Sequence, residues 1–191
     1  MMTVDSEFSL AQFLWMVLIF VGVPTMISAG IISSIWRSER TRPEQSSNRS
    51  AATKAAGGGP LGLWTTGLVA FVLGLLSCVS WLSWSADYRG EFRRPGLPAP
   101  TQFPTWQVVA CGMTVILACF VAAHFSRWTT AGGFTAAVGT TAGFTTAFSV
   151  AASTDATGQA GVGVVLSALG WGACLSVLML LRGSWVNRQR N

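Results

Sequence analysis

The chain has 191 residues, of which 51% are hydrophobic and only 10% are charged, and its formal net charge is +5. Soluble domains carry about 25% charged residues, so this composition excludes a water-soluble globule, a disordered tail and a small disulfide-stapled module. The basic residues lie at the ends of apolar segments and not along one folded face, which also excludes a nucleic-acid-binding domain.

Five apolar segments follow one another along the chain. A helix that crosses the hydrocarbon layer, which is roughly 30 Å thick, needs about 20 apolar residues. The segments are about 8–36, 61–84, 106–126, 133–153 and 161–181. We therefore expect an all-α fold, a polytopic membrane helix bundle with five transmembrane helices in a single membrane domain, 1–191.

The first apolar segment follows an acidic start that includes Asp5 and Glu7. A signal peptide needs a positively charged start and a small-residue cleavage site, so we expect this segment to stay as a membrane span. Gly22, Val23 and Pro24 lie in its middle. Because proline has no N–H and its ring clashes with the preceding turn, they predict a kink.

Two loops separate the first three segments. Residues 37–60 are basic, polar and rich in Ser and Ala, so we expect a cytoplasmic linker without a core of its own. Residues 85–105 contain four prolines, which favour extended backbone and predict a semi-rigid outer loop. This loop is either a solvated connector or a docking surface, with the candidate docking residues Tyr88, Phe92, Arg93 and Arg94.

The fourth segment is the least apolar, and small residues recur in it at every fourth position. This stripe comprises Ala131, Thr135, Gly139, Gly143, Ala147 and Ala151, and it contains a GxxxG motif. Lipid supplies no hydrophobic drive between helices, so association depends on the close contact that small residues permit. Shorter stripes occur in the second segment (Ala70, Gly74, Cys78) and in the fifth (Ala168, Gly172, Ser176). The predicted helix-packing or partner face comprises Thr135, Gly139, Gly143, Ala147, Ala168 and Gly172.

Three interpretations of the fourth segment stay open. Its stripe either packs inside the chain, which is the simplest interpretation, or docks a partner chain. The third interpretation is a polar path along its hydroxyl side, formed by Thr140, Thr141, Thr145, Thr146 and Ser149. Threonine hydroxyls also bond back to their own helix carbonyls, so a threonine-rich helix is not proof of a pore.

The distribution of positive charge favours a crossing by the fourth segment. If all five segments cross, one side of the membrane receives nine Lys and Arg and the other receives three. Without the fourth crossing each side receives six. Because cytoplasmic loops carry the excess of positive charge, we expect the N-terminus outside and the C-terminus in the cytoplasm. Seven of the nine tryptophans fall at predicted helix ends, where their amphipathic rings prefer the headgroup level.

The apolar segments carry few side chains suited to chemistry. His124 has no second ligand at helical spacing, so it is more typical of the headgroup level than of a metal site. The four cysteines lie in apolar runs, where a buried thiol is inert, and Cys111 and Cys119 are about 12 Å apart along one helix, too far for a disulfide. The sequence shows no catalytic triad, phosphate-binding loop or dinucleotide motif, so we expect no catalytic residue, no metal and no cofactor.

These features favour a non-catalytic integral membrane protein of the cell membrane, an accessory or assembly subunit that packs against a larger membrane complex. Its expected partners are the lipid bilayer and a membrane protein or further copies of itself (a homo-oligomer), with no nucleic acid. The alternative is a small oligomeric transporter or pore built on the fourth segment, although no buried charge offers ion coupling. A membrane enzyme acting on lipid is a third alternative, for which the sequence offers no candidate residues.

Overall fold

The computed structural model describes residues 10–41, 59–83, 103–152 and 160–188. In these ranges the chain is all-helical, as expected from its composition. The helices are α1 (Leu10–Val17), η1 (Leu18–Gly22), α2 (Val23–Thr41), α4 (Leu63–Leu82), α5 (Thr105–His124), α6 (Thr130–Ala152) and α7 (Ala160–Arg188). The described residues contain no strand, only an isolated parallel bridge between Leu61 and Ser126.

The elements α1, η1 and α2 form one continuous rod, and η1 is a single π-helical turn within it. The N–H of Val23 donates to the carbonyl of Leu18, five residues earlier. Pro24 follows directly, and in a regular α-helix its ring would clash with the carbonyl of Phe20. The wider π turn relieves this clash. At the position where the sequence predicts a kink, the helix therefore contains a π turn.

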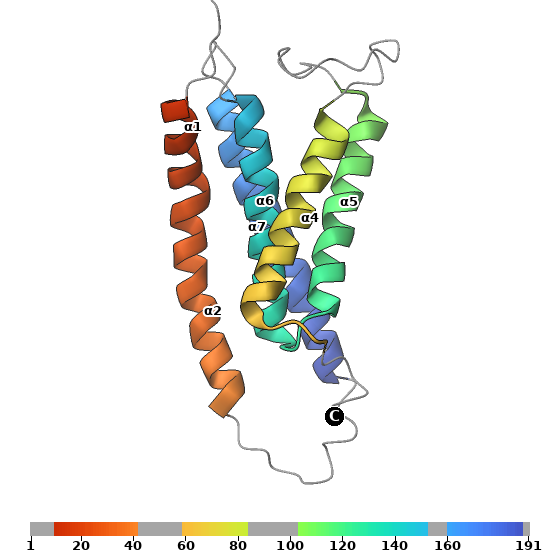
Figure 1. Ribbon diagram of the computed structural model, residues 1–191. Helices are drawn as coiled ribbons and strands as arrows, with labels where there is room; N and C mark the ends of the chain where they lie inside the picture. The colour runs from red at the N-terminus through yellow and green to blue at the C-terminus, as the bar shows by residue number, and fades with distance from the viewer. Residues whose placement is uncertain (1–9, 42–58, 84–102, 153–159, 189–191) are drawn as a thin grey trace, which may run out of the picture.

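The helices run alternately in opposite directions along one bundle (Figure 1). At the lower end of Figure 1, α2 and α7 end, α4 begins and α5 gives way to α6. At the upper end, α1 and α7 begin, and α4 and α6 end. The first described residue, Leu10, and the last, Arg188, therefore lie at opposite ends of the bundle.

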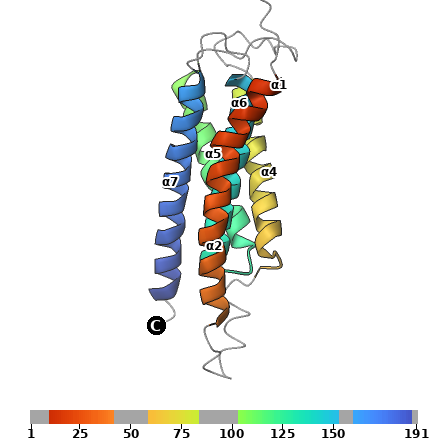
Figure 2. The same cartoon turned by 90° about the vertical axis from the view of Figure 1, so that its left-hand side faces the viewer.

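Helix α6 lies at the centre of the bundle and contacts α4, α5, α7 and all parts of the N-terminal rod. Figure 2 shows the rod of α1 and α2 on one side of α6 and α5 on the other. Ala131, Ala136 and Ala137 of α6 are completely buried. Because each carries only a methyl group, neighbouring helices approach α6 closely, which explains why the helix with the fewest bulky side chains is central.

Four helices are long and apolar enough to cross a membrane, which indicates a multi-pass membrane protein. They are Phe13–Ser38, Leu63–Leu82, Thr105–His124 and Gly161–Val186. Helix α6 does not reach the same hydropathy, because most of its residues are Ala, Thr and Gly. The expected helices of membrane-spanning length and apolarity are thus confirmed for four of the five segments.

Polar links hold α4 in place at both of its ends. At the lower end, the N–H of Leu61 donates to the carbonyl of Phe125 at 3.1 Å, and the N–H of Arg127 donates to the carbonyl of Leu61 at 2.9 Å. At the upper end, the buried amide of Gln107 on α5 donates to the carbonyl of Trp81. The indole N–H of Trp81 donates to the hydroxyl of Thr114 on α5 at 3.0 Å. The α4 helix is therefore joined to α5 at the top and to the α5–α6 turn at the bottom.

Candidate functional site

The GxxxG motif of α6 lies directly against the backbone of α4. A Cβ built on Gly139 would lie 2.5 Å from the carbonyl oxygen of Gly67. A Cβ built on Gly143 would lie 1.9 Å from the carbonyl oxygen of Phe71. Non-bonded heavy atoms attract best at about 3.5–4.0 Å and repel strongly at such short distances. Only glycine therefore fits these two positions without moving the helices apart.

The remaining α6 members of the predicted face lie on or beside this interface. Thr135 contacts α4, since its Cγ2 would lie 3.0 Å from a Cβ on Gly67. The hydroxyl of Thr135 donates to the carbonyl of Ala131, four residues earlier in α6, at 2.8 Å. Ala147 is half-buried against the core. From α4, a Cβ on Gly74 would lie 2.2 Å from the carbonyl oxygen of Thr140. The small-residue stripes of α4 and α6 thus pack against each other.

Gly172 of α7 lies at a different interface. A Cβ on Gly172 would lie 3.8 Å from Cγ2 of Thr141 on α6, an ordinary van der Waals distance. Ala168, one turn earlier, is half-buried. The structure therefore places Thr135, Gly139 and Gly143 against α4 and Gly172 against α6, and does not bring them onto one surface.

Aromatic rings fill the space between α6, α7 and α5. Phe144 and Phe148 stack with ring centroids 6.3 Å apart. Phe144 also meets Trp171 of α7 at 5.8 Å. Trp171 continues to α5, where a Cβ on Gly112 would lie 3.4 Å from the indole ring. Trp171 of α7 thus contacts two other helices, α6 and α5.

The hydroxyl side chains of the central region fall into two groups. Those of Thr135, Thr146 and Ser149 donate to carbonyl oxygens four residues earlier in α6 at 2.7–2.8 Å. Four buried hydroxyl oxygens have no oxygen or nitrogen partner among the described residues: those of Thr140, Thr141, Thr145 and Ser167. The thiol of Cys119 lies beside Thr140. Burying a hydroxyl without a hydrogen-bond partner destabilises the fold by about 1–3 kcal/mol. Close packing alone does not explain these hydroxyl groups, because apolar side chains of the same size would fill the space without that cost.

Tryptophans gather at the two ends of the bundle. At the lower end of Figure 1, Trp36 and Trp128 meet edge to face at 6.2 Å. The exposed Trp64 lies at the same end, at the start of α4. At the upper end, Trp81 and Trp106 meet edge to face at 6.3 Å. The rings therefore form two groups separated by the length of α4.

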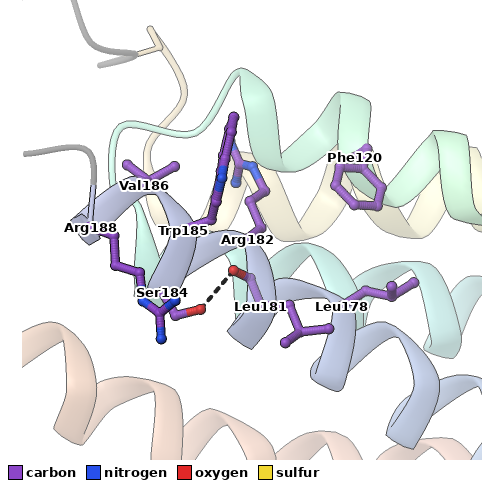
Figure 3. Close-up of a pocket in the computed structure, with 8 residues that line it drawn as sticks. All are labelled: Phe120, Leu178, Leu181, Arg182, Ser184, Trp185, Val186 and Arg188. Carbon is purple, nitrogen blue, oxygen red and sulfur yellow. Dashed lines mark hydrogen bonds between the residues drawn. The ribbon is translucent and has the colours of Figure 1, made fainter.

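Arginines of the described residues gather at the lower end only, which we call the basic end. They are Arg37, Arg40, Arg127, Arg182 and Arg188. An open groove of about 600 Å³ lies there, beside the C-terminal part of α7 (Figure 3). It is lined by Phe120 of α5 and by Leu178, Leu181, Arg182, Ser184, Trp185, Val186 and Arg188 of α7.

The outer-loop candidates lie outside the described residues: Tyr88, Phe92, Arg93 and Arg94. Within the described ranges, no three His, Cys, Asp or Glu side chains are grouped so that they could hold a metal ion. Three of the four cysteines are buried, as their apolar surroundings predict, whereas Cys174 is exposed on α7. His124 is also exposed, at the end of α5, with its ring edge-on to Phe125.

Sequence reasoning missed the groove of α7 and the role of Gln107. Both had a signal in the sequence: Arg182 directly follows an apolar run inside the last span, and Gln107 is a lone amide at the start of the third span. Neither residue alone predicts its site, because each site also needs a residue from a second helix. Phe120 of α5 completes the groove, and Trp81 of α4 accepts the hydrogen bond of Gln107.

Comparison with known proteins yields no similar protein. No protein-family model matches the chain, and no curated protein and no solved structure is significantly similar to it.

Proposed function

We propose that the chain is a five-span protein of the cell membrane in which α6 is the fourth crossing. Its 23 residues correspond to a length of about 34 Å, enough for a hydrocarbon layer of roughly 30 Å. It starts at the end of the bundle where α5 ends and reaches the end where α7 begins (Figure 1). Its low hydropathy is compatible with a crossing, because other helices and not lipid surround most of its side chains.

In this proposal the basic end faces the cytoplasm and the N-terminus lies outside. The gathering of the described arginines at one end supports it, since cytoplasmic loops carry the excess of positive charge. The two tryptophan groups support the placement in depth. Trp64 and Trp81 are 17 residues apart on α4, a rise of about 26 Å, which is close to the thickness of the hydrocarbon core.

The function that this arrangement supports best is a non-catalytic accessory or assembly subunit that docks through the outer faces of its first and last helices. One observation carries this proposal: only 11% of the first span and 17% of the last are buried inside the chain, against 39% of the α5 span. The stripe of α6 is occupied by α4, so a membrane-protein partner would meet another surface. Gly30 of α2 and Gly170 of α7 are exposed there, with no atom within 4 Å of a Cβ.

Bulky substitutions at these two glycines test the proposal. Gly30→Leu and Gly170→Leu add a side chain to the outer faces without a clash inside the chain, so the bundle should fold as before. We expect each to weaken co-purification with the partner that the unmodified full chain retains in mild detergent, as measured by mass spectrometry.

The matched control is Leu68→Met on α4, a volume-conserving change at another exposed position, which should leave the association intact. A full chain that runs as a clean monomer in mild detergent and in native membrane discs would contradict the subunit role. Self-association alone would identify the partner as a second copy of the chain.

One observation favours the alternative, a small oligomeric transporter or pore. The hydroxyl of Thr145 on the central helix is buried, with 1% of the residue exposed, and has no partner among the described residues. A transporter that uses this hydroxyl should lose solute flux in liposomes on the change Thr145→Val, which keeps the shape of the side chain. Under the subunit proposal, liposomes that contain the chain alone show no flux.

A further inference from the structure

The groove at the end of α7 combines two cationic groups with apolar walls (Figure 3). Arg182 and Arg188 supply the guanidinium groups. Leu178 and Leu181 form the wall on α7, and Phe120 of α5 lies on the side nearer the middle of the bundle. From Arg188 to Leu178 the groove follows α7 over ten residues, about 15 Å. Arg188 therefore lies at its outer end and Leu178 at its inner end, and Arg182 lies between them, next to Leu181.

Arg182 is a half-buried cation inside an apolar helix, since it falls within the candidate span Gly161–Val186. No hydrogen bond or ion pair joins Arg182 or Arg188 to another described residue. Neither α5 nor α7, the two helices that line the groove, contains an acidic residue. A charge in apolar surroundings is costly unless an anion compensates it, and intramembrane charges commonly mark functional sites. The two helices that line the groove do not supply that anion.

The depth of the groove matches the boundary between headgroups and hydrocarbon. Trp185 lines it and is 63% exposed, at the same end of the bundle as the Trp36–Trp128 pair. Such amphipathic rings prefer the headgroup level. Leu181, one turn nearer the middle of the bundle, is 60% exposed. A molecule in the groove would therefore meet Trp185 and Arg188 at headgroup depth, Arg182 at the boundary, and Leu181 and Leu178 at acyl-chain depth.

We propose that this groove binds an anionic phospholipid of the leaflet at the basic end. The phosphate lies against Arg182, whose planar guanidinium group matches phosphate oxygens, and Arg188 adds positive charge at the outer end of the groove. An acyl chain lies along Leu178, Leu181 and Phe120. Basic pockets between helices on the cytoplasmic side are suited to anionic lipid headgroups. The proposal rests on the proposed insertion in a membrane and not on the proposed subunit role.

The test is lipid binding by the purified, delipidated full chain in nonionic detergent, measured by native mass spectrometry. Phosphatidylglycerol and phosphatidylcholine with the same acyl chains serve as the anionic and zwitterionic probes. We expect tighter binding of phosphatidylglycerol, and we expect Arg182→Gln combined with Arg188→Gln to weaken it by at least about tenfold. Binding of phosphatidylcholine should change little.

The matched control is Arg127→Gln, which removes an exposed charge at the same end of the bundle but outside the groove. It should leave the preference for phosphatidylglycerol intact, and circular dichroism verifies that each variant is folded. Inorganic phosphate should not compete, because it cannot use the apolar walls. Equal binding of the two lipids, an equal loss in Arg127→Gln, or full competition by inorganic phosphate would each overturn the proposal. A failed partner experiment at Gly30 and Gly170 would leave it unaffected.

Discussion

Gly143 and Gly170 are the same residue type in neighbouring helices, yet their surroundings are opposite. A Cβ on Gly143 would meet the carbonyl oxygen of Phe71 at 1.9 Å, whereas nothing lies within 4 Å of a Cβ on Gly170. Between helices in lipid the main attraction is van der Waals contact. Because Gly143 has no Cβ, α6 approaches α4 closely and this contact stabilises the pair of helices. The missing Cβ of Gly170 permits no such contact within this chain.

This contrast gives a testable prediction. We expect Gly143→Ala to lower the free energy of unfolding by at least about 2 kcal/mol, because α6 must move away from α4 to admit the added methyl group. The measurement is unfolding of the detergent-solubilised chain by titration with sodium dodecyl sulfate.

The matched control is Gly170→Ala, which adds the same atom to an open surface. It should be neutral or stabilising by up to about 1 kcal/mol, because alanine has the higher helix propensity. Equal losses in both variants would contradict the backbone contact between α4 and α6.

Among the elements, the N-terminal rod differs most from the rest of the bundle. It contains the only π-helical turn of the described residues, and Ile32, which is 7% exposed, is the only buried hydrophobic residue described in the rod. A π turn adds one residue to the helix and so rotates everything after it by about 100°. The face that α2 turns toward α6 therefore depends on η1.

Pro24→Ala tests whether proline causes this turn. The substitution restores an N–H and removes the ring, so the N–H of Val23 should return to the carbonyl of Ile19, four residues earlier. We expect the amide hydrogen of Val23 to exchange about tenfold more slowly than in the unmodified chain. The new amide hydrogen at position 24 should also exchange slowly.

The control is Pro104→Ala, at the start of α5, which should leave the exchange of Val23 unchanged. Unchanged exchange in Pro24→Ala as well would show that contacts with α6, and not proline, maintain the π turn.

For the whole molecule, the described ends of the bundle differ in charge. The basic end collects arginines from α2, from the α5–α6 turn and from α7. Local charge alone does not establish how many times the chain crosses, since the count of Lys and Arg on each side depends on whether α6 crosses. The position of the chain after α7 therefore decides between four and five crossings.

Cysteine labelling locates that position. In a chain whose four native cysteines have been replaced, we expect Asn48→Cys and Asn191→Cys to react with a membrane-impermeant maleimide from the cytoplasmic side. Leu97→Cys should react from the outside. Labelling of positions 97 and 191 from the same side would contradict the fourth crossing and, with it, the proposed orientation.

Much of this fold was predictable from local sequence. The apolar runs predicted the described helices, because a backbone in lipid must satisfy its polar groups within each segment. The spacing of Gly139 and Gly143 predicted a close helix contact, since residues four apart share a helix face. Trp64, Trp81 and Trp106 lie next to the ends of α4 and the start of α5, as expected for rings that prefer the headgroup level, whereas α2 continues past Trp36 and α7 past Trp185.

Which helix fills which face became visible only in three dimensions. That α4 covers the stripe of α6, that Phe120 completes a groove with Arg182, and that Cys174 is exposed while three other cysteines are buried all depend on residues far apart in the chain. Lipid tails are as apolar as leucine, so hydropathy does not distinguish a face covered by a helix from one covered by lipid. The complementary shapes of two helices decide whether a face is covered by a helix or by lipid, and this fit arises only when both helices are folded and in contact.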